Sequence, residues 1–481
     1  MKKIGLISVV LLLLAVAWAG ATYRIGAKVE QQYRALLDEF SSRWPLSVTV
    51  EKYERGFAGA RARTVIELPM ASDPSSQEVG AAAGDPVETI RLVFDETLRH
   101  GPLVGGKLCA ATIASKLVGV SPGEEQFAEL LEKHPALKET LSVTRIHFDG
   151  SLTNRLAVPA LEWTVEGDEL TWGGLTVDST YSPSDKTVAG HIEMPGFAVR
   201  SEDGSMTWDG LSGDFDLVEA LPMLYVGSSK ASLGTMRLDL PDEESGQRWT
   251  LEIKGLEMAS DSALRDGLVD SKQTLKLEGV RVDDETFGPG LVELEVLNMD
   301  GAALSNLQTR AFDLFSTSPG GVPEIRIDQL LALYSRMAGQ LLAQGPEINI
   351  PKFAFTTPDG EIGGKFTLKY DGAQGIDFEN PALMLQALSA SLDLSVAERL
   401  AEMMMAGNVE AALKEARERG EIPVSFTDEI IADMAEREAR GKIEAVLAQN
   451  LIVRDGKLIR SNATFNRGEL QVNGQVMPFL Q

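Results

Sequence analysis

Residues 251–258 read Leu-Glu-Ile-Lys-Gly-Leu-Glu-Met and show the pattern on which the central part of the chain is built. Apolar and polar residues alternate up to Gly255, and after this glycine the alternation continues one residue out of phase. Alternation with a period of two is typical of a β-strand that buries one face. A slip of one residue would turn the later side chains to the other face, but a glycine β-bulge restores them by inserting one residue. The segment therefore predicts a strand that is bent at Gly255.

Three more segments share this arrangement, and their glycines are Gly174, Gly210 and Gly279. Together the four copies predict repeated strands, each bent by a bulge, in a curved antiparallel sheet with one apolar face. The copies are unevenly spaced, so they do not form a strict solenoid repeat. The alternative is that these glycines mark hairpin turns between shorter strands.

The same patterns divide the chain into four parts. Residues 1–23 are expected to form a membrane anchor, and residues 24–142 a membrane-proximal α/β segment. Residues 143–300 form the β-rich, repeat-like region, and residues 301–481 mix helices with hairpins. The predicted fold class is therefore α+β, with a strand-dominated, curved antiparallel sheet, glycine bulges, packed helices in the C-terminal third and an N-terminal transmembrane helix.

Helical periodicity and turn residues locate the individual elements. Helices are expected at residues 26–44, 123–142 with a break near Pro135, 328–344, 395–406, 409–419 and 428–449. Strands are expected at residues 46–50, 64–68, 90–94, 348–355, 362–370 and 388–394, and around Asp455-Gly456 and Asn473-Gly474. Residues 395–398, Ser-Val-Ala-Glu, indicate a capping box. Met403, Met404 and Met405 are expected to pack in the core, with a partner-facing patch as the alternative.

An uncharged apolar run at residues 4–22 follows Lys2 and Lys3. It is about as long as the ~20 residues that cross a bilayer, and longer than the ~7–15 apolar residues of a secretory signal. We therefore expect an uncleaved anchor, with signal cleavage after Ala19 or a buried core helix as the alternatives. Lysine and arginine residues flank the run on both sides, so their count does not set its orientation. The long domain that follows favours export.

The charge of the chain limits its partners. The net charge is −26 over 481 residues, and because residues 1–23 contribute only two lysines, the remainder carries −28. Such an acidic body repels nucleic acid and anionic headgroups at long range, so we expect no nucleic-acid partner. Cys109 is the one cysteine, which rules out an internal disulfide and a cysteine-based metal cluster.

The sequence contains none of the common motifs for nucleophilic hydrolysis, zinc peptidases, nucleotide binding or calcium binding. The four histidines are scattered along the chain without the spacing of metal ligands, and each is expected to be structural. They are His100, His134, His147 and His191. We therefore expect no enzyme, no cofactor, and neither a catalytic nor a metal site.

Three groups of short motifs resemble the YdgA-like family of Gram-negative bacteria. Their residues are Tyr53, Arg55, Gly56 and Phe57; His100, Gly101 and Pro102; and Phe465, Asn466, Gly468 and Gly474. The resemblance depends on the order and spacing of these motifs along nearly the whole chain. It implies a single-pass protein of the bacterial inner membrane, with its body in the periplasm and no established biochemical activity. It brings no catalytic residues.

Three functions remain open from the sequence. In the first, the body holds a lipid or another amphiphile on an open apolar sheet face, while residues 4–22 anchor it in the inner membrane. In the second, helices cover that face and the protein is a scaffold for other envelope proteins. In the third, a hydrolase has a dispersed site that no motif marks. The first two are separated by whether the helices between residues 301 and 449 cover the sheet.

Overall fold

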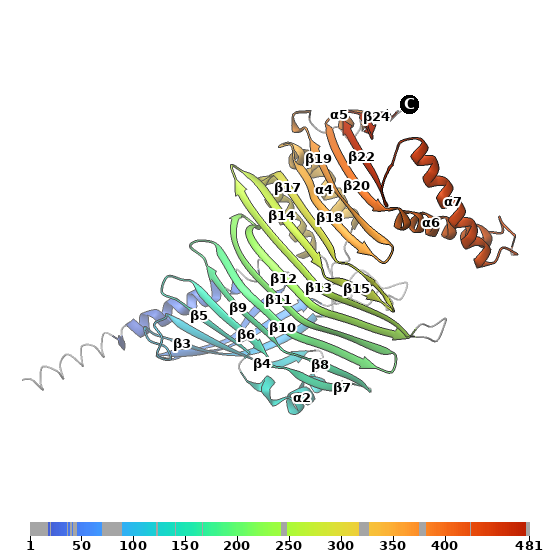
Figure 1. Cartoon of the computed structure of the whole chain (residues 1–481). Coiled ribbons are helices and arrows are strands. Elements are labelled where there is room, and N and C mark those ends of the chain that lie inside the picture. The colour runs from blue at the N-terminus through green and yellow to red at the C-terminus, as the bar shows by residue number, and fades with distance from the viewer. Residues whose placement is uncertain are drawn as a thin grey trace, which may run out of the picture. The chain divides into compact units, whose positions relative to one another are not determined.

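The computed structural model describes residues 18–19, 21–35, 37–38, 41, 46–69, 89–121, 124–139, 141–165, 167–241, 248–316, 327–374, 381–423 and 425–477 (Figure 1). The expected anchor at residues 4–22 lies almost entirely outside this range. No helix among the described residues combines the length and the apolar character needed to cross a membrane. The chain divides into two compact units: unit 1 comprises residues 1–198, 211–225 and 305–335, and unit 2 comprises residues 199–210, 226–304 and 336–481.

Unit 1 is built on an open antiparallel sheet with the strand order β1-β2-β3-β4-β5-β6-β9-β10. The strands are β1 (Ser47–Arg55), β2 (Gly59–Pro69), β3 (Thr89–His100), β4 (Ala111–Ser121), β5 (Ser142–Ile146), β6 (Leu152–Val158), β9 (Leu175–Ser182) and β10 (Thr187–Ser201). β7 (Leu161–Val165) and β8 (Asp168–Trp172) form a hairpin, and β8 also pairs with β10. The strands expected at 46–50, 64–68 and 90–94 are confirmed as parts of β1, β2 and β3.

The predicted break near Pro135 is also confirmed. The helix expected at residues 123–142 consists of α2 (Glu124–Lys133) and a short 3₁₀ helix, η1 (Pro135–Lys138). Proline has no amide hydrogen for the helical ladder, and its ring crowds the preceding turn. Leu137 in η1 is buried, so this short helix contributes to the packing of unit 1.

Helical residues 21–35 pack across one face of the unit 1 sheet. Val29 and Tyr33 are buried from the helix side. The sheet contributes the small residues Ala60, Ala62, Ala110 and Ala111 together with Leu98, Ile113 and Ile146. Small side chains let the helix approach the strands closely, so its apolar stripe is fully covered. The amphipathic helix expected at residues 26–44 is thus confirmed over its first two and a half turns or so.

Unit 2 contains antiparallel strands in the order β12-β13-β14-β17-β18-β19-β20-β22-β23-β24, and they belong to the same 24-stranded sheet as the strands of unit 1. The strands are β12 (Leu224–Pro241), β13 (Arg248–Arg265), β14 (Leu268–Leu277), β17 (Gly290–Asp300), β18 (Glu347–Thr357), β19 (Gly360–Tyr370), β20 (Leu388–Ala397), β22 (Leu458–Asn466), β23 (Glu469–Val472) and β24 (Gln475–Met477). The short strands β15 (Gly279–Val282), β16 (Glu285–Phe287) and β21 (Val453–Asp455) pair with β13, β15 and β22, respectively. β11 (Gly204–Leu221) contributes residues to both units.

The helices of the C-terminal third are α3 (Gly301–Ser316), α4 (Ile327–Leu342), α5 (Pro381–Gln386), α6 (Glu398–Glu418) and α7 (Asp428–Ala448), with a short 3₁₀ helix, η2 (Gly372–Gln374). The helices expected at 328–344 and 428–449 are confirmed as α4 and α7. The hairpin around Asp359-Gly360 is also confirmed as β18 and β19. The strand-dominated antiparallel character of the fold is therefore as predicted.

Two predictions around α6 are wrong. The helices expected at 395–406 and 409–419 form one continuous helix, since Gly407 lowers helix propensity without breaking the ladder. The capping box at residues 395–398 does not form, because Ser395 is still part of β20 and donates its hydroxyl hydrogen bond to the carbonyl of Gly363. The helix begins after Ala397, which provides no side-chain cap.

Candidate functional site

The first two motif groups meet at helical residues 21–35 of unit 1. The Arg55 guanidinium donates a 2.8 Å hydrogen bond to the carbonyl oxygen of Tyr23 and lies 4.8 Å from the centre of the Tyr23 ring. Phe57 lies near Trp18, and Tyr53 lies near Tyr33, with ring centres 6.4 and 5.9 Å apart. Gly56 donates its amide to the carbonyl of Gly59 in the turn between β1 and β2. The Tyr-x-Arg-Gly-Phe motif therefore holds the helix against the first hairpin of the sheet.

His100 lies beneath the same helix, at the end of β3. Its side chain is buried against Gly26, where any Cβ atom would overlap the imidazole ring. Among the described residues, neither ring nitrogen has a hydrogen-bond partner of good geometry. Burial lowers the pKa of His100, and hydrogen bonding to the backbone of Thr22 and Gly59 opposes this effect. Gly101 follows with a φ of 140° beside the hydroxyl of Thr22, and Pro102 continues the turn. The His-Gly-Pro motif therefore contacts the helix and fixes its position on the sheet.

A buried polar network crosses the apolar core of unit 1. The hydroxyl of Tyr33 hydrogen-bonds to the Glu96 carboxylate and lies 2.6 Å from the hydroxyl of Thr64. Thr64 and Ser115 each donate to Glu96 at 3.2 Å. Burial raises the pKa of Glu96 above its ordinary value even though these three donors lower it, and burial together with Glu96 raises the pKa of Tyr33. The network joins the helix to β2, β3 and β4, and its groups are occupied with one another.

The third motif group lies in unit 2 and is not brought together with the other two. Phe465 and Asn466 end β22, and the turn to β23 is formed by Arg467 and Gly468, both with positive φ. Asn473 and Gly474 also have positive φ and form the next turn. Consecutive residues with positive φ are typical of tight hairpins, which favour Asn-Gly. The Asn473 side chain further fixes this corner by accepting from the amide of Asn462 and donating to the carbonyl of Asn450.

The four glycines expected at bulges have different environments. Gly174 has a φ of 96° and lies between β8 and β9, while Gly210 and Gly255 have φ values of 67° and 59° inside β11 and β13. The pairing of β13 keeps one register on both sides of Gly255, without the extra residue of a bulge. Gly279 has no positive φ and begins β15, after an interruption of pairing at Glu278.

Register shifts occur at other positions in the described strands. They lie next to Glu51 in β1, Val118 in β4, Asn298 in β17 and Pro351 in β18. Pro351 cannot donate a ladder hydrogen bond, and proline is tolerated in sheets chiefly at bulges and edges. Asn298 has a φ of 60°, a conformation that asparagine tolerates better than most residues. These bulges therefore follow from single residues and not from the repeated glycine pattern.

One face of the unit 2 sheet is apolar along continuous cross-strand rows, and we call it the apolar face. One row runs through direct pairing partners on six strands: Met258, Leu275, Val292, Phe353, Gly364 and Leu394. The adjacent row contains Leu277, Gly290, Phe355, Ile362, Val396 and Ile459. The opposite face is polar and carries ion pairs such as Lys272 with Glu295 and Lys369 with Glu347. Alternation in the sequence has therefore separated the two faces.

Helix α6 follows β20 and contacts β19 and β20, and α6 and α7 lie beside the C-terminal strands of the sheet (Figure 1). A small, half-open apolar hollow of about 190 Å³ lies between Leu394, Val396 and Ile459 on the strands and Met405 and Ile443 on the helices. At the other end of the row, Met258 is 56% exposed, Leu275 is 40% exposed and Val292 is 39% exposed. The face therefore passes from a covered end to an end that is open to solvent.

Met403 and Met404 do not pack in the core as expected, because both side chains are exposed on α6. Only Met405 of this run points into the hollow beneath the helix pair. Three consecutive helical residues cover about 200–300° of the helix circumference, so they cannot all face the same sheet. Met434 on α7 is also exposed.

The remaining histidines each have separate surroundings. His147 lies 3.3 Å from the hydroxyl of Thr153, and His191 pairs with Asp214 at 2.8 Å on the surface of the sheet. His134 precedes η1, with its Nε2 atom buried.

Comparison with known proteins places the whole chain in one group of bacterial sequences. A family model described as "Bacterial protein of unknown function (DUF945)" matches residues 1–479. Protein YdgA of Escherichia coli (strain K12) is 20% identical over 510 residues, covering 97% of this chain and 93% of that protein. An uncharacterized protein of Haemophilus influenzae is 20% identical over 328 residues, covering 64% of this chain and 85% of that protein. No solved structure matches the chain.

Proposed function

The chain belongs to the DUF945 family of bacterial proteins, and from this premise we propose that it is a membrane-anchored envelope protein that holds a lipid or another amphiphile on the apolar face of unit 2. The resemblance to YdgA-like proteins, recognised from the short motifs, is confirmed by the match over nearly the full length. In this proposal, residues 4–22 anchor the chain in the inner membrane and the body lies in the periplasm.

The proposal depends on one observation, which is that part of the apolar face is exposed to solvent. Met258, Leu275 and Val292 are neighbours across three strands, so their exposed surfaces form one continuous strip. Fully burying an apolar side chain of this size stabilises by about 1.5–3 kcal/mol, so a strip left in water costs the protein unless a ligand covers it. Large exposed apolar patches in soluble domains mark binding sites.

The form of this surface favours an elongated apolar ligand. The rows extend as a sheet surface across successive strands spaced ~4.8 Å apart, so six strands span about 24 Å. That length is comparable to an extended acyl chain, whereas the enclosed hollow of about 190 Å³ is smaller than the ~300–1,000 Å³ of usual small-molecule pockets. A long amphiphile lying along the rows would fit better than a compact metabolite.

The experiment compares lipid retention between two matched double variants. The full-length chain is purified from its membrane in a mild detergent, and lipids that remain bound are extracted and measured by mass spectrometry. Met258→Gln with Leu275→Gln makes the strip polar, and Glu257→Gln with Lys276→Gln changes the neighbouring pair on the opposite face of the same strands. We expect the wild type and the control to retain a stoichiometric amphiphile and the strip variant to lose it. Equal retention by both variants, or none by the wild type, would contradict the proposal.

A second candidate function is the binding of a protein partner in the envelope. Exposed Met403, Met404 and Met434 favour it, because flexible thioether side chains suit adaptable protein interfaces. A photoreactive residue in place of Met404 would then crosslink to a defined protein in cells. The two candidates concern different surfaces of unit 2, so the lipid experiment and the crosslink distinguish them.

A further inference from the structure

Unit 1 carries a basic surface on the face of its sheet that points away from helical residues 21–35. Its residues alternate along the strands with the core residues Ala60, Ala62, Leu98 and Ile113. Three neighbouring cross-strand rows on β1 to β6 contain seven lysine or arginine residues and only two carboxylates. We call this surface the basic face. The charged members are Lys52, Arg61, Arg63, Arg99, Lys116, Arg145 and Arg155, with Glu54 and Asp95.

The excess of positive charge on the basic face is opposite in sign to the net charge of the whole chain, which is −26. Cations still outnumber carboxylates on this face when the ion pairs are left out of the count. Lys52 pairs with Glu54 at 2.6 Å, the Arg63 guanidinium makes two hydrogen bonds to Asp95 at 2.8 and 3.1 Å, and Arg155 pairs with Asp178 of β9 at 3.3 Å. Both carboxylates of the face are therefore neutralised. Four cations have no ion-pair partner in the part of the chain that the structure describes: Arg61, Arg99, Lys116 and Arg145.

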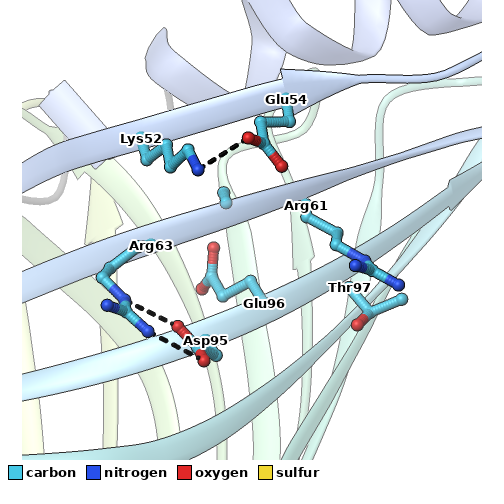
Figure 2. A pocket seen from close by; sticks show the side chains of 8 residues that line it. Lys52, Glu54, Arg61, Arg63, Asp95, Glu96 and Thr97 are labelled. Carbon is cyan, nitrogen blue, oxygen red and sulfur yellow. Dashed lines mark hydrogen bonds and ion pairs between the residues drawn. The ribbon is translucent and has the colours of Figure 1, made fainter.

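The surface is hollowed at one of these unpaired cations. A depression of about 410 Å³ is lined on β1, β2 and β3 by three cations, three carboxylates, an alanine and a threonine: Lys52, Arg61, Arg63, Glu54, Asp95, Glu96, Ala62 and Thr97. Figure 2 shows the two ion pairs on one side, with Arg61 and Thr97 next to each other and outside both pairs. Arg61 and Thr97 are direct partners across β2 and β3, and Arg99 lies two residues further along β3 on the same face. Diagonal neighbours of this kind are about 7–8 Å apart, within reach of two long side chains.

We infer that the edge of this hollow binds a phosphate group between Arg61 and Thr97, which line the hollow, and Arg99, which lies beside it on the same face of β3. Arginine presents a planar set of donors that matches two oxygens of a phosphate, and a threonine hydroxyl adds a donor at the same anion. The carboxylates that line the hollow have other partners: Glu54 pairs with Lys52, Asp95 with Arg63, and Glu96 with the hydroxyl groups of the core network. Glu54 is also the direct strand partner of Arg61, so the phosphate group must bind on the Thr97 side of that arginine. The surrounding negative charge disfavours a long polyanion, so the ligand is a compact phosphate compound or a phospholipid headgroup.

This site is independent of the proposed amphiphile surface, since it lies in the other unit. Titration calorimetry on the full chain in a neutral detergent measures binding of inorganic pyrophosphate. In parallel, flotation measures binding of the chain, in neutral nanodiscs, to phosphatidylcholine vesicles with and without phosphatidylglycerol. The double variant Arg61→Gln with Arg99→Gln should weaken binding by about tenfold or more, as expected for lost hydrogen bonds to a charged group. Arg155→Gln is the control. It also removes one positive charge from the basic face, but Arg155 is already paired with Asp178 and lies outside the proposed site, so phosphate binding should be unchanged.

Pyrophosphate binding with this variant pattern would identify a free phosphate compound, and vesicle binding alone with the same pattern would identify a headgroup. Melting temperatures of the variants are measured in parallel. If the double variant unfolds, Arg61→Lys replaces it as the test of phosphate binding. This variant keeps the positive charge but loses the planar donor set of arginine, so it should still weaken binding. Binding of neither probe by the wild type, or an equal loss in Arg155→Gln, would overturn the inference.

Discussion

Units 1 and 2 start from the same pattern, an antiparallel sheet with one apolar face, and complete it differently. In unit 1, helical residues 21–35 close the face, and Leu98 beneath them is only 1% exposed. In unit 2, α6 and α7 close one end of the face, and Leu275 at the other end is 40% exposed. The comparison teaches that alternation specifies an apolar face but does not specify its cover. Where the chain supplies the cover, the face is a core, and where it does not, the face is a candidate binding surface.

The comparison is tested most strongly by the same substitution in both units. Leu98→Ala should lower the free energy of unfolding of unit 1 by about 2–5 kcal/mol, because it leaves a cavity in a closed core. Leu275→Ala should lower that of unit 2 by less than about 1 kcal/mol, because solvent already reaches the side chain. Hydrogen exchange against denaturant concentration, followed separately in the strands of each unit, measures both. Similar costs at the two positions would mean that the unit 2 face is as closed as that of unit 1.

The close packing of helical residues 21–35 on His100 is tested by Gly26→Ala. The added methyl group would overlap the His100 ring, so we expect a loss of about 1–3 kcal/mol in the stability of unit 1. Gly441→Ala in α7 is the matched control, because nothing lies near a Cβ atom there. It should stabilise by up to about 1 kcal/mol through helix propensity. A neutral result at Gly26 would show that the helix is not held closely by His100.

The role of the positive φ at Gly255 in β13 is tested by comparing Gly255→Ala with Gly279→Ala. Gly255 has a φ of 59°, and a Cβ atom there would overlap the side chain of Glu278. We expect Gly255→Ala to cost about 1–2 kcal/mol from the left-handed backbone alone. Gly279→Ala should cost less, because that residue has no positive φ and its nearest contact, 3.3 Å to the carbonyl of Phe287, requires only a small adjustment. Thermal unfolding of the two variants measures the difference, and the reverse order would contradict it.

The polar network of unit 1 gives the smallest expected effect. Because burial raises the pKa of Glu96, the carboxyl group of Glu96 binds its proton more tightly in the folded state than in the unfolded chain. The stability linked to Glu96 is therefore complete at acidic pH and is lost as pH rises from the ordinary value of 4.5 through the raised pKa. Glu96→Gln should stabilise unit 1 at neutral pH, with a gain that disappears in acid, as measured by denaturant titration at each pH. A gain that is independent of pH would assign the effect to packing.

Much of the architecture could be predicted from local patterns. The hairpins at Asp359-Gly360 and Asn473-Gly474, the break at Pro135 and the helix α7 follow from turn and helix chemistry within a few residues. The capping box at Ser395 failed because a strand partner competed for the same residue. The helices α3 and α5 were not predicted, although Asp300 directly before α3 is a typical N-cap residue and accepts a 2.8 Å hydrogen bond from the amide of Ala303.

The sites were harder to predict than the elements, because they depend on pairing between distant strands. The motif residues Arg55 and His100 are 45 positions apart in the sequence and meet only because both contact residues 21–35. The basic face is hidden in the sequence because its members alternate with alanine and leucine on strands β2 and β3. The exposed end of the apolar face was equally undecided, since the sequence shows which residues are apolar but not which of them a helix covers.

The most direct test of the account is a photocrosslink from the open end of the apolar face in living cells. A photoreactive residue at position 275 should crosslink to lipid, and the same residue at position 276, on the opposite face of β14, should not. Mass spectrometry of the purified chain identifies the adduct. Lipid adducts at position 275 but not at position 276 are the result that the account predicts. Crosslinks from both positions alike, or from position 275 only to other parts of the same chain, would contradict it.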